Sequence, residues 1–477
     1  MKVLLATPPH QEKLESFYPN LGLLYLASFG RLHAQKVSPE FYYLEGGEYD
    51  SIERYVASIK SISPDVIGLS FATHPYRFVY RSISAIKEEL PEVPIVCGGP
   101  HPTVMPVHVL ENTPADICVI GEGEVTFSEI LKTLQSESIS SLKKIRGIAF
   151  RNKDSISLTP PRAFIKELDS IPFPAWDIID FRKYKGYRWK KASPETCMAS
   201  TRGCLFNCTF CSNPVWKSSK PWLRMRSPAN IAEEISLLYH EYGVREFYDW
   251  ADELNCVRPW ALKVCDEIGK LKLTDAYFKC QLRADKVSDE LVDKLKKIGC
   301  WHVELGIESG NQRVLNGIQK GITLEQVVHA SSVLKRYGIK VLGFFMIMNI
   351  WEENGKLMFE TPEMCENTFR FARKLLSRKL LSNMSWSIAT PIPGSRMYDI
   401  AQRHKLIGDF EDLRFDTDYP IMRLPGITEK EISRIKRNGM MTQAYYALRS
   451  GDLNWGDIKF FLSKLKALTY HLGRSLT

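Results

Sequence analysis

The sequence contains no long apolar run. Its longest apolar stretches fall well short of the ~18 to 20 residues that a membrane-spanning helix needs. The first residues, MKVLLATPPH, have the character of a β-strand and reach Pro8 and Pro9 too soon for a signal peptide. Internal repeats and heptad patterns are also absent, so the sequence indicates no oligomeric state. These absences predict a cytoplasmic chain without a transmembrane segment.

The sequence also lacks a dominant charge and a disulfide framework. Its net charge is +9 over 477 residues and is spread along the chain, so nucleic acid is not expected as a partner. Eleven scattered cysteines fit a reducing compartment better than paired disulfides. Basic residues alternate with aromatic ones at 181–191 and in the C-terminal FFLSKLKALTYHLGRSL. Each segment is either a solvated face whose aromatic rings pack inward or a contact with an anionic substrate, a protein or a lipid surface.

Three cysteines at CxxxCxxC spacing, Cys204, Cys208 and Cys211, are the most informative feature of the chain. A tetrahedral zinc site needs a fourth ligand, and none stands at CxxC or HxxxH spacing elsewhere. Three thiolates on a [4Fe-4S] cluster leave one iron without a protein ligand, where a small molecule can bind and receive an electron. The spacing therefore favours a catalytic cluster over three neighbouring buried thiols or a simple redox site.

The cysteine segment STRGCLFNCTFCSN resembles the radical S-adenosylmethionine (SAM) enzymes, whose signature has an aromatic residue before the last cysteine, here Phe210. The resemblance implies that Cys204, Cys208 and Cys211 hold a [4Fe-4S] cluster and that SAM chelates the open iron. It also implies that the reduced cluster cleaves SAM to a 5′-deoxyadenosyl radical. The electron donor is then a reductase or a protein of the ferredoxin or flavodoxin type.

The first 150 residues alternate between short apolar strands and helices, which predicts a Rossmann-like, doubly wound parallel sheet. The expected strands are 3–6, 66–70, 95–97 and 117–120, and the expected helices are 21–32 and 83–90. Ligands of such sheets bind beyond the carboxyl ends of the strands. The loops found there are TPPH, SFATHPYRF, CGGPHPT and GEGEVTF.

These loops resemble the cobalamin-binding domain that precedes the radical SAM core in one large subgroup, where PP…LGLLYLA, DVIGLS, GGPHPT and GEGE recur in this order. The resemblance implies cobalamin as a cofactor and assigns residues of three loops to its site. They are Gly98, Gly99, His101 and Thr103 near the corrin and nucleotide tail, Gly121, Glu122 and Gly123 on the same rim, and Ala72, Thr73 and His74 below the cobalt.

Two features leave the cobalamin assignment open to alternatives. The DxHxxG sequence that supplies an axial histidine in other cobalamin proteins is missing, which leaves His74 as a candidate lower ligand of the cobalt. His101 could instead cap the following helix or satisfy a buried backbone group. Related enzymes also keep the fold of this domain as a scaffold without cobalamin.

A connector over 151–192 leads into the expected SAM core over 193–400, where strands and helices alternate as in a partial (β/α)6 barrel. A mainly helical C-terminal region over 401–477 follows, whose aromatic residues are expected to pack. These aromatic residues include Tyr445, Tyr446, Trp455, Phe460 and Phe461. The fold class is thus α/β, with a Rossmann-like sheet, a radical SAM barrel and C-terminal helices.

SAM carries a sulfonium, an amine and a carboxylate, so its site needs an acid, a base and backbone amides. Asp252 and Glu253 end an expected strand, where two carboxylates either hold the ribose or amine of SAM or cap the next helix. The further candidates for the SAM site are Arg283, Glu308 and Ser309, and more weakly Gln281 and Lys320.

One departure from the subgroup concerns the substrate. Where relatives have a compact GxPGE after the fifth strand, this chain reads MIMNIWEENGKLMFETPEMCENT, an insertion that carries Trp351, Met358 and Phe359. Insertions at the active face often shape the substrate pocket. The substrate is therefore left open among peptide, lipid, sugar and small metabolite.

The resemblance implies a C-methyltransferase that uses two SAM molecules per turnover and methylates an unactivated carbon. Its products would be the methylated substrate, 5′-deoxyadenosine and S-adenosylhomocysteine. Coupling, cyclisation or rearrangement of carbon skeletons, for example of lipid chains, is the alternative and would form no S-adenosylhomocysteine. A non-catalytic carrier of cobalamin or of the cluster would not cleave SAM at all.

Overall fold

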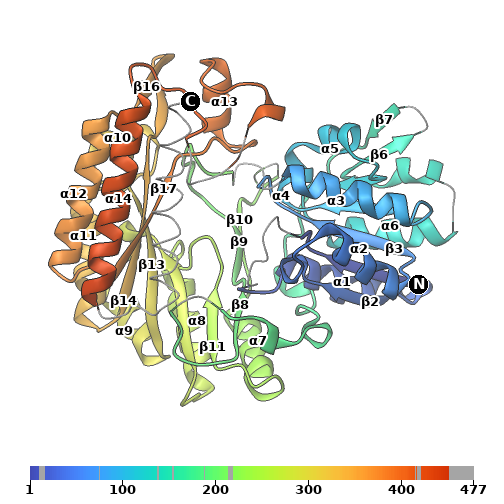
Figure 1. The fold of residues 1–477 in the computed structure, drawn as a ribbon. Helices are drawn as coiled ribbons and strands as arrows, with labels where there is room; N and C mark the ends of the chain where they lie inside the picture. The colour runs from blue at the N-terminus through green and yellow to red at the C-terminus, as the bar shows by residue number, and fades with distance from the viewer. Residues whose placement is uncertain are drawn as a thin grey trace.

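A computed structural model of the chain describes residues 1–9, 17–74, 76–136, 139–152, 155–186, 189–212, 217, 219–413, 415 and 420–450. The chain forms two α/β units that stand side by side, with the N-terminal unit in blue and cyan and the second unit in green to orange (Figure 1). Trp455, Phe460, Phe461 and the basic C-terminal segment lie outside the described residues.

The N-terminal unit is built on a seven-stranded sheet of order β2-β1-β3-β4-β5-β6-β7. Its first five strands are parallel, and β6 and β7 are antiparallel additions at one edge. The strands are β1 (Lys2–Ala6), β2 (Glu40–Leu44), β3 (Val66–Ser70), β4 (Ile95–Gly98), β5 (Ile117–Val119), β6 (Ile148–Asn152) and β7 (Ser155–Leu158). The expected Rossmann-like sheet is confirmed, and its edge hairpin extends to Leu158, past the expected boundary at residue 150.

Helices cover both faces of this sheet, as the doubly wound prediction requires. Apolar residues of α1 (Leu21–His33) and α6 (Glu124–Ser136) pack on one face. The other face is covered by α2 (Ile52–Ile62), α3 (Tyr76–Glu89), α4 (Pro100–Val104) and α5 (Pro106–Asn112). The helix expected over 83–90 begins earlier, at Tyr76, because Tyr76, Val79, Tyr80 and Ile83 share its buried face at helical spacing.

The second unit holds a six-stranded parallel sheet of order β17-β14-β13-β12-β11-β8. Its strands are β8 (Glu195–Met198), β11 (Glu246–Asp249), β12 (Tyr277–Leu282), β13 (Cys300–Glu308), β14 (Lys340–Ile347) and β17 (Asn383–Ile388). Its helices are α7 (Pro228–His240), α8 (Arg258–Lys270), α9 (Asp289–Lys297), α10 (Gln312–Gly317), α11 (Leu324–Arg336), α12 (Pro362–Ser377) and α13 (Arg396–Arg403). Strands in sequential spatial order, each followed by a helix, confirm the partial (β/α)6 barrel.

A short ribbon of β9 (Thr201–Gly203) and β10 (Leu223–Met225) runs between the two units (Figure 1). The C-terminal helix α14 (Glu429–Ser450) packs against α12 and β17 on the far side of the barrel. Gly439 allows this close approach, since a Cβ there would lie 2.6 Å from the Trp386 ring. No helix within the described ranges is both long and apolar enough to cross a membrane.

The segment that follows α13 joins the two units. Leu413 and Phe415 belong to the same buried cluster as Tyr76 of α3, and the Tyr76 hydroxyl donates to the carbonyl of Phe410 at 3.1 Å. The Phe410 ring centroid lies 4.9 Å from that of Tyr76. The C-terminal region therefore contributes core residues to the N-terminal unit.

The insertion after β14 forms a hairpin of β15 (Ile350–Glu353) and β16 (Lys356–Phe359). Trp351 packs over Gly317, where a Cβ would lie 2.3 Å from the indole ring. At the base of the hairpin the buried Glu360 accepts hydrogen bonds from the backbone N–H and the side-chain amide of Asn349, at 3.1 and 2.8 Å. Burial raises the pKa of the Glu360 carboxyl from 4.5 to about 7, although the Asn349 hydrogen bonds lower it.

This buried carboxyl predicts a loss of stability with rising pH. Between about pH 4.5 and 7 the folded chain holds a proton on Glu360 that the unfolded chain has lost. The contribution of this group to the free energy of unfolding is therefore fully present below pH 4.5 and is lost as the pH rises through 7. Relative to Glu360→Gln, which copies the neutral form, the wild type should lose roughly 3 kcal/mol of unfolding free energy across this range. Denaturant unfolding of both proteins at pH 5 and pH 8 measures how much unfolding free energy each one loses. An equal loss in the wild type and in Glu360→Gln would refute the prediction.

Candidate active site between the two units

The cysteine loop directly follows β9 and lies where the two units meet. Cys204 is buried, and Cys208 and Cys211 are half-buried. Two backbone hydrogen bonds at Thr209 fix the loop to the barrel. The N–H of Thr209 donates to the carbonyl of Ile318 at 2.9 Å, and the carbonyl of Thr209 accepts from the N–H of Met397 at 2.7 Å. The loop is thus held by the segment after β13 and by the start of α13.

A fourth cysteine that the sequence analysis passed over lies beside this loop. Cys256 follows β11, and its thiol forms a hydrogen bond with the Cys204 sulfur that lowers the pKa of Cys204 to about 7, while burial acts in the opposite direction. Burial raises the pKa of the Cys208 thiol, and the charge of Lys320 opposes that rise. Thiolates are the metal-binding form of cysteine, so a cationic neighbour favours binding.

No three His, Cys, Asp or Glu side chains within the described residues converge on a single metal position. A zinc ion needs its ligands within about 2.0 to 2.3 Å of one point. A [4Fe-4S] cluster does not need such convergence, because each cysteine binds a different iron.

Charged groups from three strand ends surround the cysteines. The Lys320 ammonium, 6% exposed, donates to Glu308 Oε1 at 2.9 Å and lies 6.0 Å from the Phe210 ring centroid. Glu308 itself has a positive φ of 67°, which turns the chain at the end of β13. Lys320, a weaker candidate from the sequence, is therefore part of the site and not a surface cap.

Glu253 offers a free acceptor at this place. Its Oε2 atom is buried and has no hydrogen-bond partner among the described residues. Burial raises the pKa of the Glu253 carboxyl to about 8, although Lys320 and Arg283 lower it. A buried acceptor without a donor is costly. The amine or ribose hydroxyls of SAM are donors of the kind this atom lacks, so the residues present fit SAM.

Three predicted SAM residues have structural partners instead. Arg283 donates from Nε to Asp285 Oδ1 at 2.8 Å and from a terminal nitrogen to the carbonyl of Lys320 at 2.7 Å. Its guanidinium carbon lies 3.5 Å from the ring centroid of Phe206, so Arg283 packs against the cysteine loop and stabilises it. Ser309 is fully buried and pairs with the Thr368 hydroxyl at 3.1 Å. Gln281 donates to the Tyr248 hydroxyl inside the barrel at 2.8 Å.

A cavity of about 490 Å³ separates the N-terminal sheet from the cysteine loop. Its floor is formed by the carboxyl ends of β3, β4 and β5 and by the first turns of α1 and α6. The wall from the second unit includes Ala199, Arg202, Gly203, Cys211, Ser212, Arg224 and Asp252. The predicted residues Gly98, Gly99, Gly121, Glu122 and Gly123 all line it. The cavity therefore reaches from the predicted cobalamin loops to a cluster cysteine.

Cobalamin fits the chemistry of this cavity. Gly98, Gly99, Gly121 and Gly123 all line the cavity, and a backbone without side chains there lets a flat ring approach closely. Arg224 Nε and Glu124 Oε2 are buried in the lining and have no hydrogen-bond partner among the described residues. A donor and an acceptor without partners suit the amide side chains of a corrin. No histidine belongs to the described lining.

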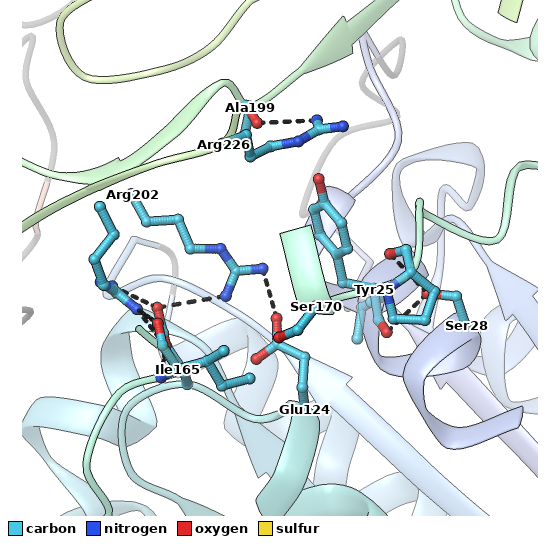
Figure 2. Close-up of polar contacts among 12 residues, drawn as sticks. Tyr25, Ser28, Glu124, Ile165, Ser170, Ala199, Arg202 and Arg226 are labelled. Atoms are coloured by element: carbon cyan, nitrogen blue, oxygen red, sulfur yellow. Dashed lines mark hydrogen bonds and ion pairs between the residues drawn. The ribbon is translucent and has the colours of Figure 1, made fainter. Parts of the chain in front are cut away.

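Buried ion pairs connect the cobalamin loop with the ribbon that carries the cysteines. Arg224 binds Glu122 through both terminal nitrogens, at 2.7 and 2.8 Å, and Arg202 binds Glu124 at 2.6 Å. Figure 2 shows Arg202 and Glu124 from the two units pointing toward one another, with Arg226 donating to the carbonyl of Ala199 nearby. The bonds from Arg224 and the charge of Arg202 hold the pKa of Glu122 below its usual range, although burial alone would raise it.

Several predicted cobalamin residues lie outside this cavity. His101 is fully buried, with Nδ1 at 3.1 Å from the Thr73 hydroxyl and Nε2 at 2.9 Å from the Tyr80 hydroxyl. Burial lowers the pKa of His101 to about 3, which keeps the ring neutral. The alternative of a satisfied core histidine therefore describes His101 better than a place near the corrin. Ala72 and His74 are exposed, and neither belongs to the lining.

Thr103 holds two of the loops together. Its hydroxyl donates to the carbonyl of Gly99 at 2.8 Å and accepts from the N–H of Gly121 at 3.1 Å. Thr103 thus stabilises the two loops that form part of the cavity floor.

Comparison with known proteins identifies the family. The chain matches the B12 binding domain over residues 11–131 and the radical SAM superfamily over residues 198–361. An uncharacterised methyltransferase of Pyrococcus horikoshii is 31% identical over 449 residues, which cover 93% of this chain and 92% of that protein. The chain belongs to the cobalamin-dependent radical SAM enzymes. Its cofactors are accordingly a [4Fe-4S] cluster, SAM and cobalamin.

Other members of this cobalamin-dependent radical SAM family carry different activities in their names. The cytidylyl-2-hydroxyethylphosphonate methyltransferase of Streptomyces wedmorensis is 27% identical, covering 88% of this chain and 81% of its own. The anaerobic magnesium-protoporphyrin IX monomethyl ester cyclase of Cereibacter sphaeroides is also 27% identical, covering 81% of this chain and 60% of its own. Membership therefore makes the chain an enzyme without fixing its substrate.

Solved structures of radical SAM enzymes share the fold of this family member. The cobalamin-dependent SAM radical enzyme OxsB gives a TM-score of 0.71 at 17% identity, over 98% of this chain and 70% of its own. The methyltransferase TsrM from Kitasatospora setae gives 0.66 at 16% identity, over 92% of this chain and 84% of its own. The arrangement of sheet and barrel is the fold of these proteins.

Four residues of this enzyme were missed by sequence reasoning, namely Glu124, Arg202, Arg224 and Cys256. Glu124 stands in the GEGE motif, and Arg202 stands two residues before the first cluster cysteine, so both positions carried a signal. The charges of Arg202 and Glu124 balance one another only across the interface between units. Arg224 and Cys256 carried no motif, and their roles follow from tertiary contacts alone.

Proposed function

We propose that this enzyme is a C-methyltransferase that methylates an unactivated carbon and consumes two SAM molecules per turnover. The observation that carries the proposal is the shared cavity, whose lining includes Gly98 and Gly121 of the cobalamin loops and Cys211 and Asp252 of the cluster site. A group delivered from one cofactor site can meet a substrate activated at the other only if both open into one space. The methyltransferases among its relatives support the same reading.

The residues of the chain divide the binding tasks in this proposal. Cys204, Cys208 and Cys211 hold the cluster. Glu308 and Lys320 are the charged pair placed to bind SAM, the buried Glu253 carboxyl offers it an unpaired oxygen, and Asp252 lines the cavity. When bound, the cluster and SAM supply a carbon radical by reductive cleavage, and cobalamin supplies a transferable methyl group. Arg283 and Phe210 are positioning residues, since they pack on or within the cysteine loop.

Polar side chains inside the barrel are held in one arrangement by hydrogen bonds. Tyr248 donates to Glu304 at 2.6 Å, and Gln281 donates to the Tyr248 hydroxyl, so these side chains are locked in one arrangement. Tyr18 of the N-terminal unit reaches into the barrel, donates to Glu195 and packs on Tyr248 with ring centroids 5.8 Å apart. The N-terminal unit thereby closes one side of the barrel, which keeps water from a reactive radical.

A second candidate function is coupling, cyclisation or rearrangement of a carbon skeleton without methyl transfer. Relatives named as cyclases favour it, and the one from Cereibacter sphaeroides is 27% identical over 81% of this chain. The N-terminal unit would then serve as a scaffold or in another role. The two functions predict different products from SAM, so one assay separates them.

The test uses the anaerobically loaded enzyme, SAM labelled in its methyl group, a reductant and a panel of carbon acceptors. Methyl transfer predicts that S-adenosylhomocysteine and 5′-deoxyadenosine form in equal amounts with a labelled product. Deoxyadenosine formed with substrate turnover but without S-adenosylhomocysteine would refute the methyltransferase and support the second function. No SAM cleavage with any reductant would refute both and leave a carrier.

We also propose domain boundaries at residues 192 and 400, with the first boundary placed after the edge hairpin at Leu158 and not at residue 150. The cofactor residues are those assigned above that line the site. We further propose a cytoplasmic location and an electron donor that is a reductase or of the ferredoxin or flavodoxin type.

A further inference from the structure

An exposed apolar patch lies directly beside the cluster cysteines. Leu205, which follows Cys204, is 48% exposed, and Trp222 is 37% exposed. Gly203 is opposite Leu223 in the antiparallel ribbon, so Trp222 lies at the same end of the ribbon as Leu205. Exposed large apolar side chains that gather in one place mark interaction sites.

The same surface is positively charged. The ammonium groups of Lys217 and Lys220 lie 5.5 and 5.4 Å from the ring centroid of Trp222. Lys217 also donates to the side-chain oxygen of Asn207 in the cysteine loop, at 2.8 Å. We name Leu205, Lys217, Lys220 and Trp222 the cluster-side patch.

The sequence around the patch carries no compensating acid. From residue 196 to residue 232 the chain has five Lys and Arg and no Asp or Glu. Three of the five, Arg202, Arg224 and Arg226, pair with buried acids from other segments. The two lysines of the cluster-side patch therefore carry the outward charge of this stretch. None of the four patch residues belongs to the described lining of the cavity between the units, so the patch is a separate surface.

We propose that the cluster-side patch is the docking site of an acidic electron-transfer protein of the flavodoxin type. The inference rests on the proposed function in so far as the cluster must be reduced. Leu205 stands between two cluster cysteines in the chain, so a partner seated on it comes next to the cluster. An apolar centre with a positive rim complements a donor with an acidic face, and complementary charge speeds encounter and fixes orientation.

The electron balance of the docked step is simple. One electron leaves the donor, which is oxidised by one electron, and enters the cluster. Transfer of that electron to the sulfonium of SAM breaks one carbon–sulfur bond and yields methionine and the deoxyadenosyl radical. Each SAM molecule cleaved in this way consumes one electron from the donor, and the deoxyadenosyl radical becomes deoxyadenosine when it takes a hydrogen atom from the substrate.

The test compares a protein donor with a small chemical donor that needs no docking site. Lys220→Glu reverses one charge of the patch and leaves Lys217, which supports the cysteine loop, in place. Flavodoxin, reduced by its NADPH-dependent reductase, should need roughly tenfold higher concentration for half-maximal deoxyadenosine formation by this variant at about 50 mM salt. The dithionite-driven rate should stay at the wild-type level. Titration calorimetry of oxidised flavodoxin should show the same rise in Kd, and this measurement needs no turnover.

Two further variants make the result specific. Lys36→Glu places the same charge change on an exposed lysine just beyond α1, at the end of that helix away from the cavity, and should leave both measurements unchanged. Trp222→Ala should weaken flavodoxin binding without reducing the iron content of the protein. High salt should weaken wild-type binding to the level of Lys220→Glu.

Three outcomes would overturn the inference. One is an unchanged Kd in both Lys220→Glu and Trp222→Ala. Another is an equal fall of the dithionite-driven and flavodoxin-driven rates, which would place the patch in the cluster or substrate site. A third is an equal rise of Kd in Lys36→Glu, which would make the effect one of net charge. If the wild type forms no deoxyadenosine with any reductant, the proposed function fails, and the Kd values alone decide on the docking site.

Discussion

Cys208→Ala is expected to abolish formation of 5′-deoxyadenosine from SAM. A [4Fe-4S] cluster that keeps only two of its three cysteines loses the ligand of one iron, and an intact cluster is required for electron transfer to SAM. Cys208 is half-buried in the loop after β9 and does not belong to the core of the N-terminal unit. The variant should therefore keep a folded N-terminal unit, seen as cooperative thermal unfolding and retained corrinoid.

Cys365→Ala is the matched control for this experiment. Cys365 is fully buried in α12, away from the cysteine loop, so its replacement should lower the melting temperature and keep the iron. Deoxyadenosine formed by Cys208→Ala at the wild-type rate would remove the cluster assignment. Loss of activity and iron in both variants would show that general unfolding, and not ligand loss, was measured.

Arg224→Met is expected to cost about 3 kcal/mol of unfolding free energy, because it leaves a buried carboxylate without its main partner. Arg224 is 4% exposed and binds Glu122 through two nitrogens, at 2.7 and 2.8 Å. Arg202, 3.4 Å away, and the backbone N–H of Ile165 remain as partners of Glu122 and compensate in part. Since Arg224 and Glu122 also line the cavity, corrinoid retention should fall together with stability.

The matched control is Arg31→Met, which breaks an exposed pair of the same geometry. Arg31 binds Asp177 through two nitrogens, at 2.8 and 2.9 Å, with the Arg31 side chain 40% exposed. Its loss should cost less than about 1 kcal/mol. The double variant Glu122→Gln with Arg224→Met should recover part of the stability, because no buried charge is left alone. Equal costs for Arg224→Met and Arg31→Met in denaturant unfolding would contradict the buried-network account.

The sequence predicted what depends on local pattern. Cys204, Cys208 and Cys211 stand within eight consecutive positions, so their spacing favoured a catalytic cluster, and the resemblance to radical SAM enzymes named them as its ligands. The strands of the N-terminal sheet are short apolar runs between turns, and the parallel pairing of β1, β3, β4 and β5 was expected from the alternation of strands and helices. Gly98 and Gly121 were assigned through the resemblance of GGPHPT and GEGE to the loops of a cobalamin-binding domain, and both line the cavity.

What the sequence could not give depends on partners far along the chain. The ring of His101 is satisfied by Thr73 and Tyr80, which lie 28 and 21 residues away, so its burial could not be seen in the loop motif. Arg202 meets Glu124 across 78 residues and between two units. Such pairs form only when the two units come together. They could not be predicted from the sequence, because a single charged residue in a sequence usually lies in solvent.

The measurement that tests the central claim most directly is the cofactor content of the anaerobically purified enzyme from cells supplied with cobalamin. Counts of iron, sulfide and corrinoid per chain, with a visible spectrum, should give about four irons and one corrinoid, the loading of one cluster and one cobalamin. That result would direct the search to methyl acceptors. A full cluster with no corrinoid, even after refolding with excess cobalamin, would contradict the account and make the N-terminal unit a scaffold.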